Sequence, residues 1–224
     1  MDAPISILST KVISPTLRES LLSKQFKIVD RDFISIQYNE MELDHSNLNS
    51  TVLITSKNVI KSLIQSTQIS ILRDKDIYCV GSSVPKLLEP YGISVQGSFP
   101  NAYALGEHIV SQNISKATFL CGNKSRPELP DLLKKNNVKF QKIELYTTVL
   151  TPHKLDESFD TLLFFCPSAV ESYLTDHQIT TEKIICIGQT TASAVRPFSN
   201  HIILADQHKV SSVIHKTIEL FQQS

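Results

Sequence analysis

Short apolar runs alternate along the whole chain with segments whose apolar residues recur at helical spacing. Runs such as Ile77–Val80 and Ile184–Ile187 are apolar at almost every position rather than at every second one. Strands of this kind are buried on both faces, which is typical of parallel sheets covered by helices on each side. The pattern predicts an α/β fold, in which ligands bind beyond the carboxyl ends of the strands.

Charge and hydropathy narrow the class of protein further. The 224 residues carry 22 basic and 22 acidic side chains, whereas nucleic-acid and anionic membrane surfaces need clustered positive charge. No apolar stretch reaches the roughly 18 residues of a membrane span, and the first residues lack the basic segment of a signal peptide. The four cysteines form no Cys-x-x-Cys pair and are interpreted as reduced thiols. We expect a cytoplasmic protein that has neither nucleic acid nor membrane as a partner.

The strands and the turns that follow them repeat at about half the chain length. The segment 55–58 resembles 165–168, and the turn at Gly81 resembles the turn at Gly188, each about 110 residues later. This period indicates two similar α/β units that arose by duplication. Taken alone, it places the boundary between them near residue 114.

Two strand ends share a glycine that is followed by hydroxyl residues at the start of a helix. They are Gly81 with Ser82 and Ser83, and Gly188 with Thr190 and Thr191. Glycine lets a ligand approach the backbone, and a helix start offers unpaired N–H groups, so a carboxylate or phosphate fits such a turn. Because serine and threonine are also common helix caps, capping alone is an equally good interpretation.

A third strand end, at 121–126, carries two cations and amide donors. Asn123, Lys124 and Arg126 suit an acidic ligand, although Arg126 lies near a helix start, where a cation opposes the helix dipole. A solvated loop is the alternative. The segment is not a phosphate-binding P-loop, because the spacing G-x-x-x-x-G-K-[ST] is absent.

Other residue types with reactive side chains have simpler interpretations. Cys166, just before Pro167 at a helix start, has no histidine at a catalytic spacing and is interpreted as a small buried residue. The histidines form no metal-ligand motif, His208 and His215 are interpreted as surface residues, and no G-x-G-x-x-G fingerprint occurs. We therefore expect neither a metal site nor an organic cofactor. Tyr146 ends a strand-like run, where a lone tyrosine is usually a packing residue.

Taken in order, the strand-end segments resemble the uroporphyrinogen-III synthase family. The segment from Leu120 through the leucine-rich stretch to Lys134, followed by Leu145–Val149, is similar to the family's Gly-Asn turn, helix and Val-Tyr-x-Thr strand. Residues 164–170 are similar to its Phe-x-Ser-Pro-Ser-Ala-Val motif, and residues 187–192 to its Ile-Gly-Pro-Thr-Thr-Ala motif. Residues 54–56 are similar to its Phe-Thr-Ser motif. Each motif is short, but the ordered set extends over nearly the whole chain.

The chain departs from the family pattern at four positions. Cys166 replaces a serine, Gln189 a proline, Lys57 a proline or small residue, and Val84 a threonine. These changes affect the roles of single side chains more than the resemblance, because backbone N–H groups can make the same contacts.

The resemblance implies a two-domain α/β protein whose active site is the cleft between the domains. It also implies domains that are interleaved in sequence. Residues 1–35 with 149–224 then form one parallel-sheet domain, and residues 36–148 form the other. Two connections, near Ser35 and Val149, join them as a two-stranded hinge.

The implied activity is the closure of hydroxymethylbilane, a linear tetrapyrrole with eight carboxylates, to uroporphyrinogen III. Water is lost, the terminal ring is inverted through a spiro intermediate, no cofactor takes part, and a monomer is expected. Because the free bilane closes unaided to the uninverted isomer, the main task of the protein is to control the shape of its substrate.

The resemblance also assigns roles to residues. Tyr146, which matches the family's tyrosine, is predicted to help the terminal hydroxyl leave by donating a proton. The predicted substrate-binding residues are Thr55, Ser56, Gly81, Ser82, Ser83, Gly122, Asn123, Lys124, Arg126, Pro167, Ser168, Gly188, Thr190 and Thr191. The alternative from another class is a non-catalytic, two-lobed module that binds small anions, or a degenerate synthase-like regulatory module.

Overall fold

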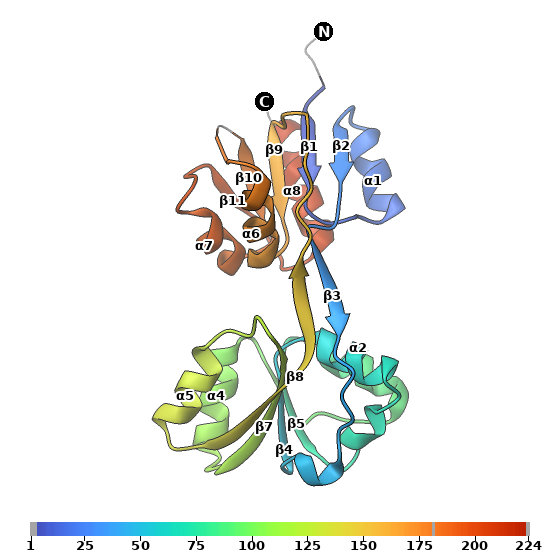
Figure 1. The fold of residues 1–224 in the computed structure, drawn as a ribbon. Helices are drawn as coiled ribbons and strands as arrows, with labels where there is room; N and C mark the ends of the chain where they lie inside the picture. The colour runs from blue at the N-terminus through green and yellow to red at the C-terminus, as the bar shows by residue number, and fades with distance from the viewer. Residues whose placement is uncertain (1–3, 181, 223–224) are drawn as a thin grey trace. The chain divides into compact units, whose positions relative to one another are not determined.

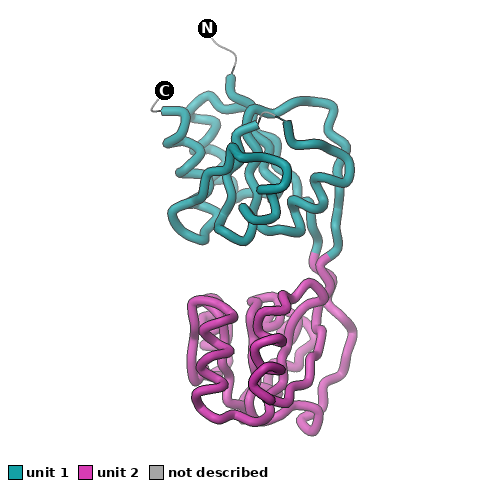
Figure 2. Tube along the Cα trace, turned by 90° about the vertical axis from the view of Figure 1, so that its left-hand side faces the viewer, with its two compact units in different colours: residues 1–35, 149–224 teal, residues 36–148 magenta. Residues whose placement is uncertain are grey.

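The computed structural model describes residues 4–180 and 182–222, and the chain divides into two compact units (Figure 2). Unit 1 comprises residues 1–35 and 149–224, and unit 2 comprises residues 36–148. Each unit contains one sheet with helices on both faces (Figure 1). The prediction of an α/β fold with two similar parallel-sheet units is therefore confirmed.

Unit 1 is a parallel sheet with the strand order β11-β10-β9-β1-β2. Its elements are β1 (Ser6–Ser9), α1 (Pro15–Leu22), β2 (Lys27–Asp30), β9 (Thr161–Phe164), α6 (Pro167–Asp176), β10 (Lys183–Cys186), α7 (Gln189–Val195), β11 (Ile202–Leu204) and α8 (Val210–Gln222). Leu21 of α1 and Val213 of α8 pack on one face of the sheet, and Val170 of α6 and Val195 of α7 pack on the other. Because β9 is buried at every position, its sequence is apolar throughout all but its first residue.

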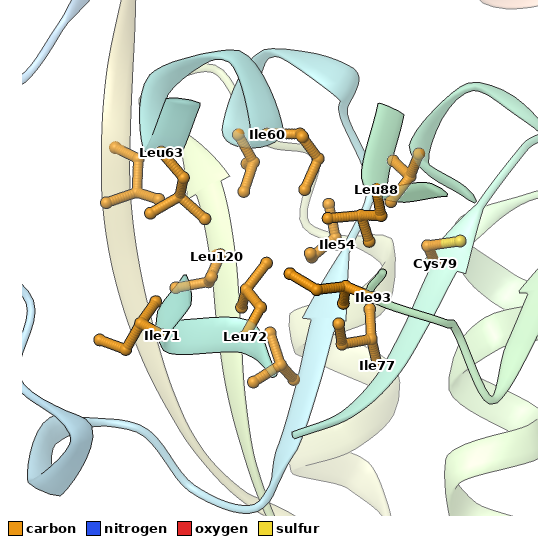
Figure 3. Close-up of a cluster of buried hydrophobic side chains, with 14 of the residues drawn as sticks. Ile54, Ile60, Leu63, Ile71, Leu72, Ile77, Cys79, Leu88, Ile93 and Leu120 are labelled. Atoms are coloured by element: carbon orange, nitrogen blue, oxygen red, sulfur yellow. The ribbon is translucent and has the colours of Figure 1, made fainter. Parts of the chain in front are cut away.

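Unit 2 has the strand order β3-β8-β7-β4-β5-β6. Its elements are β3 (Ile34–Tyr38), η1 (His45–Asn47), β4 (Thr51–Ile54), α2 (Lys57–Gln65), η2 (Ile69–Leu72), β5 (Asp76–Val80), α3 (Ser83–Leu88), η3 (Glu89–Tyr91), β6 (Gly97–Phe99), α4 (Ala102–Ser111), β7 (Lys116–Gly122), α5 (Glu128–Lys135) and β8 (Lys139–Leu150). Helices α2 and α3 cover one face, where Ile60 and Leu63 of α2 pack with Ile54 and Leu120 of the sheet (Figure 3). Leu105 of α4 and the buried residues of α5 cover the other face.

Strand β3 is the exception to the parallel arrangement. The N–H of Asn39 donates to the carbonyl of Leu145 at 3.0 Å, and the N–H of Thr151 donates to the carbonyl of Phe33 at 3.0 Å. The partner number falls as the residue number rises, so β3 and β8 are antiparallel. The chain crosses from one unit to the other twice, once within β3 and once within β8.

The sheets of the two units have the same plan. The order β2-β1-β9-β10-β11 of unit 1 corresponds to the order β8-β7-β4-β5-β6 of unit 2. Details agree as well: Gln25 after α1 and Asn137 after α5 have φ of 64° and 58°, in the left-handed region that ends many helices. Each half of the sequence thus supplies one of its strand–helix–strand segments to the other half's sheet. Residue 114 lies inside unit 2, between α4 and β7, so the repeat taken alone misplaces the boundary.

Candidate active site

The predicted site residues of both units lie beyond the carboxyl ends of parallel strands. In unit 2 they follow β4 (Thr55, Ser56), β5 (Gly81, Ser82, Ser83) and β7 (Asn123, Lys124, Arg126), with Gly122 the last residue of β7. In unit 1 they follow β9 (Pro167, Ser168) and β10 (Gly188, Thr190, Thr191). Because neighbouring strands are parallel, each group gathers at one edge of its own sheet, which is where such sheets bind ligands.

Tyr146 lies in β8, half-buried, beside the strand end of β7. Its ring covers Gly122, where a Cβ atom would lie 2.9 Å from Cδ2 of Tyr146 and closer still to Cε2 and Cζ. Burial raises the pKa of the Tyr146 phenol, and hydrogen bonding with Ser56 and Asn58 lowers it by a smaller amount. The net shift is upward from the ordinary value of about 10, so the phenol is protonated at neutral pH.

Asn58 is a site residue that sequence reasoning missed. It is the second residue of α2, and its N–H donates to Oγ of Ser56, the residue that caps this helix, at 3.2 Å. Like Ser56, its side chain lowers the pKa of the Tyr146 phenol, by less than burial raises that pKa. The Thr-Ser-Lys-Asn sequence that ends at Asn58 marks this strand end, but nothing in it distinguishes Asn58 from an ordinary first-turn residue.

The two glycine turns differ although their positions are equivalent. Gly81 has a φ of 74° and open space around its Cα, so it is glycine for conformational reasons. Gly188 is extended, with a φ of 178°, and a Cβ atom there would lie 2.8 Å from Cδ2 of His208. Gly188 therefore leaves room for the imidazole of His208, which comes from the segment after β11.

In both turns the N-cap residue makes no side-chain hydrogen bond to its helix. Ser82 is the N-cap residue of α3, yet its side chain makes no capping hydrogen bond, and it is exposed together with Ser83. In unit 1, Thr190 is half-buried, whereas Thr191 is only 2% exposed. Thr191 matches Val84 of unit 2, which is also buried, so this position faces the core in both units. The substrate-binding prediction for Thr191 stays a prediction, and burial limits what its hydroxyl can contact.

The cations at the end of β7 lie on an exposed segment. Arg126 pairs with Glu128 at 3.6 Å, and both side chains are about half exposed. Glu128 and Asp131 occupy the first turn of α5, where carboxylates interact favourably with the helix dipole. These two carboxylates offset the unfavourable position of Arg126, and Lys124 is exposed beside them.

At the end of β9, Pro167 is the first residue of α6 and Ser168 the second, both half-buried. The N-cap residue is Cys166, in extended conformation, and its side chain makes no capping hydrogen bond. Cys79, Cys121 and Cys186 are buried, and none of the four cysteines forms a disulfide bond. Burial raises the pKa of Cys186 to about 12, so this thiol stays protonated at neutral pH.

In the part of the chain that the structure describes, these strand ends carry no metal site and border neither of two surface hollows. The ranges 4–180 and 182–222 contain no group of three or more His, Cys, Asp and Glu side chains placed to hold a metal ion. His208 and His215 are exposed. Shallow hollows lie on α8, beside His215, and at the end of α3, beside Gly92, and neither is lined by a predicted site residue. None of the helices seen in the described residues is long and apolar enough to cross a bilayer.

Comparisons with known proteins place the chain among its relatives. The family model described as uroporphyrinogen-III synthase HemD matches residues 11–215. The porphyrin biosynthesis protein HemD of Ruminiclostridium josui is 23% identical over 191 residues, which cover 75% of this chain. The chain spans only 38% of the length of that curated relative.

Solved structures show the same fold. Uroporphyrinogen-III synthetase from Helicobacter pylori is 19% identical, with a TM-score of 0.70 and coverage of 96% of this chain and 99% of that chain. A mutant uroporphyrinogen III synthase from Thermus thermophilus is 12% identical, with a TM-score of 0.72 and coverage of 98% and 99%. The structural likeness concerns the fold, and the family model covers most of the sequence. The chain belongs to the uroporphyrinogen-III synthase family.

Proposed function

We propose that this protein is an active uroporphyrinogen-III synthase, which closes hydroxymethylbilane to uroporphyrinogen III with loss of water and inversion of the terminal ring. The family match over residues 11–215 carries the proposal, because it includes all of the strand ends described above. The non-catalytic anion-binding module that the sequence left open has no observation in its favour.

The substrate's carboxylates are proposed to bind at these strand ends. Lys124 and Arg126 supply exposed cations, and the exposed hydroxyls of Ser82 and Ser83 supply donors in unit 2. In unit 1 the donors are supplied by Ser168, which follows Pro167 in the first turn of α6, and by the turn of Gly188 and Thr190. Each contact at a helix start contributes roughly 0.3–1 kcal/mol, so many are needed to hold one conformation of a flexible tetrapyrrole.

Tyr146 is proposed to assist the loss of the bilane's terminal hydroxyl. As the C–O bond breaks, the pyrrole nitrogen pushes electrons toward the carbon that the hydroxyl leaves, and the phenol donates its proton so that water leaves rather than hydroxide. The proton released when the ring closes restores the phenol. The upward-shifted pKa of Tyr146 supports this role, because burial outweighs the opposing effect of Ser56 and Asn58 and keeps the phenol protonated at neutral pH.

We propose further that the two units are the protein's domains, with the β3–β8 pair as the hinge. The unit boundaries fall within these two strands, which supports the idea. We also propose that the protein acts as a cytoplasmic monomer without metal or organic cofactor, as the family resemblance implies. Size-exclusion chromatography with light scattering tests the monomer, and unchanged turnover after chelation tests the independence from metal.

Consumption of hydroxymethylbilane tests the catalytic proposal. The bilane is generated in place, and its disappearance is followed with and without the purified protein. A rate that rises in proportion to protein concentration, well above the spontaneous rate, is expected. Binding of the bilane without any acceleration would replace the enzyme by the anion-binding module.

A further inference from the structure

We infer that Gly122 and Asn123 are positioning residues for Tyr146: Gly122 makes room for the ring, and Asn123 fixes the backbone around it. This inference rests on the role proposed for Tyr146 in the reaction. It changes the role of the Gly-Asn turn, which the sequence analysis assigned to the substrate's carboxylates.

A break in strand register first brings the two residues together. Along β7 and β8, Cys121 pairs with Glu144, but the next residue, Gly122, pairs with Tyr146. One residue of β8, Leu145, is therefore extra, which is the definition of a β-bulge. Without the bulge, Tyr146 would lie opposite Asn123 rather than opposite the one residue of this turn that has no side chain.

The bulge also changes the face on which Tyr146 lies. Side chains of successive strand residues point to opposite faces of a sheet. Ile143, Leu145 and Tyr146 nevertheless all pack against the same hydrophobic cluster, the one beneath α2. The bulge therefore turns Tyr146 to the face of the sheet that α2 covers. Bulges that redirect a side chain in this way are common beside active sites.

Gly122 is a glycine because of the ring that covers it. Its backbone is not in the left-handed region, so its conformation is open to alanine. The obstacle is steric, because an alanine Cβ would overlap Cε2 and Cζ of Tyr146. Substitution at this position therefore displaces the tyrosine ring without straining the backbone.

Asn123 holds the backbone of β8 on both sides of Thr147. Its N–H donates to the carbonyl of Tyr146 at 3.2 Å, and its Oδ1 accepts from the N–H of Thr148 at 2.9 Å. The side-chain oxygen is thus committed to the protein. An amide that is aimed at the strand backbone just beyond the tyrosine acts on Tyr146 rather than on a ligand.

The other side of β8 is held in the same manner. Asn39 donates from Nδ2 to the carbonyl of Glu144 at 2.7 Å and accepts at Oδ1 from the hydroxyl of Thr147 at 3.2 Å. The hydroxyl of Ser62, buried in α2, donates to the carbonyl of Leu145 at 2.8 Å. These side-chain hydrogen bonds hold the segment that carries the tyrosine.

The first test uses amide exchange to probe the β8 backbone beside Tyr146, without any substrate. In Asn123→Ala, amide exchange at Thr148 should become at least tenfold faster, because its acceptor is gone. Asn123→Asp retains an acceptor oxygen and should keep exchange within twofold of wild type. Asn136→Ala is the matched control, because Asn136 also bonds a backbone carbonyl, that of Leu132, in the same unit. Unchanged exchange at Thr148 in Asn123→Ala would overturn the inference.

The second test is kinetic and separates positioning from binding. Asn123→Ala should lower kcat about tenfold and leave KM within twofold, whereas Asn123→Asp should retain kcat. A raised KM with an unchanged kcat in Asn123→Ala would show a substrate ligand and overturn the inference. Because the exchange measurement needs no activity, a failure of the proposed synthase function is distinguished from a failure of the positioning role.

Gly122→Ala tests the packing of the ring. With 13C-labelled tyrosine, the Cζ resonance of Tyr146, assigned with Tyr146→Phe, should shift in Gly122→Ala. The substitution should also lower the Tm in the wild-type background but much less in the Tyr146→Ala background, where no ring remains to be displaced. An equal loss of Tm in both backgrounds, with an unmoved resonance, would show that Gly122 does not serve the tyrosine.

Discussion

Unit 1 and unit 2 build the same arrangement of strands from differently ordered pieces of chain. In unit 1 the segment β1-α1-β2 comes first and adds to the sheet that β9, β10 and β11 complete much later. In unit 2 the equivalent segment, β7-α5-β8, comes last and adds to β4, β5 and β6. Each half of the sequence repeat contributes strands to both sheets, so the repeat and the compact units do not coincide.

The strand ends of the two units have also diverged. Unit 2 carries the bulge, the tyrosine and the side chains that hold it, whereas β2, the unit 1 counterpart of β8, ends at Asp30. Unit 1 has a buried tyrosine of its own, Tyr173, but it packs in α6 against the rings of Phe164 and His177. The same plan therefore supports a polar, directed phenol in one unit and a packing tyrosine in the other.

The largest expected effect comes from cutting the chain. A fragment of residues 36–148 contains β4, β5, β6 and β7 whole, with most of β3 and β8, and should unfold cooperatively on heating, as followed by circular dichroism. Fragments 1–114 and 115–224 each split both sheets, separating β4 from β7 and β1 from β9. Alone they should show no cooperative transition, and mixing them should restore one. Cooperative unfolding of 1–114 by itself would mean that the sequence repeat, not the sheet, is the folding unit.

The next largest effect should distinguish the two buried tyrosines. Tyr146→Phe removes only the hydroxyl and should lower turnover about 10-fold to 100-fold, at or below the low end of general-acid effects. The Tm and the product isomer should not change. Tyr173→Phe, the matched variant in unit 1, should keep wild-type turnover. Wild-type turnover in Tyr146→Phe would leave Tyr146 as a packing residue like Tyr173.

The two glycine turns should respond differently to alanine. Gly81→Ala forces a side chain into the left-handed region and should lower the free energy of unfolding by about 1–2 kcal/mol. Gly188→Ala imposes no such strain, because only the exposed imidazole of His208 has to move. Urea denaturation of both variants measures the difference. Equal losses of stability would remove the structural distinction between the turns.

The smallest effect concerns alkaline pH. Burial, and to a smaller extent Glu182, raises the pKa of Tyr173 to about 12, whereas an unfolded tyrosine ionises near 10. Between these values the unfolded state has lost a proton that the folded state keeps, so stability falls as pH rises. Tyr173→Phe should reduce the loss of stability between pH 9 and pH 11 by on the order of 1 kcal/mol, as measured by urea denaturation. A pH slope unaffected by the substitution would contradict the burial of this phenol.

The fold was largely predictable because its strands are buried on both faces. Strands such as β4 and β9 are buried at every position, and mainly apolar runs satisfy that environment. The exchange of segments was not predictable from the runs themselves, because an apolar strand does not specify its neighbour. β1 pairs with β9 across more than half of the chain, and no pattern in either strand identifies the partner.

The site was predictable in its location and less so in its detail. Parallel strands place their carboxyl ends at one edge, so residues such as Ser82 and Lys124 were found at strand ends as expected. The bulge could not be predicted from the sequence, because one extra residue in β8 still leaves a strand-like sequence. Asn39 and Asn58 were missed for a related reason: each is a single polar residue whose partners are distant in sequence. The burial of Thr191 could not be read from a short motif either, and its role as a substrate ligand stays a prediction.

The identity of the product shows whether the protein closes the bilane with inversion of the terminal ring. Hydroxymethylbilane is converted with and without the protein, the porphyrinogens are oxidised, and the isomers are separated by chromatography. Uroporphyrin III is expected as the main product with protein, and the uninverted isomer without it. Tyr146→Phe should reach the same isomer more slowly. If the uninverted isomer is the sole product in the presence of protein, the proposed synthase function is wrong.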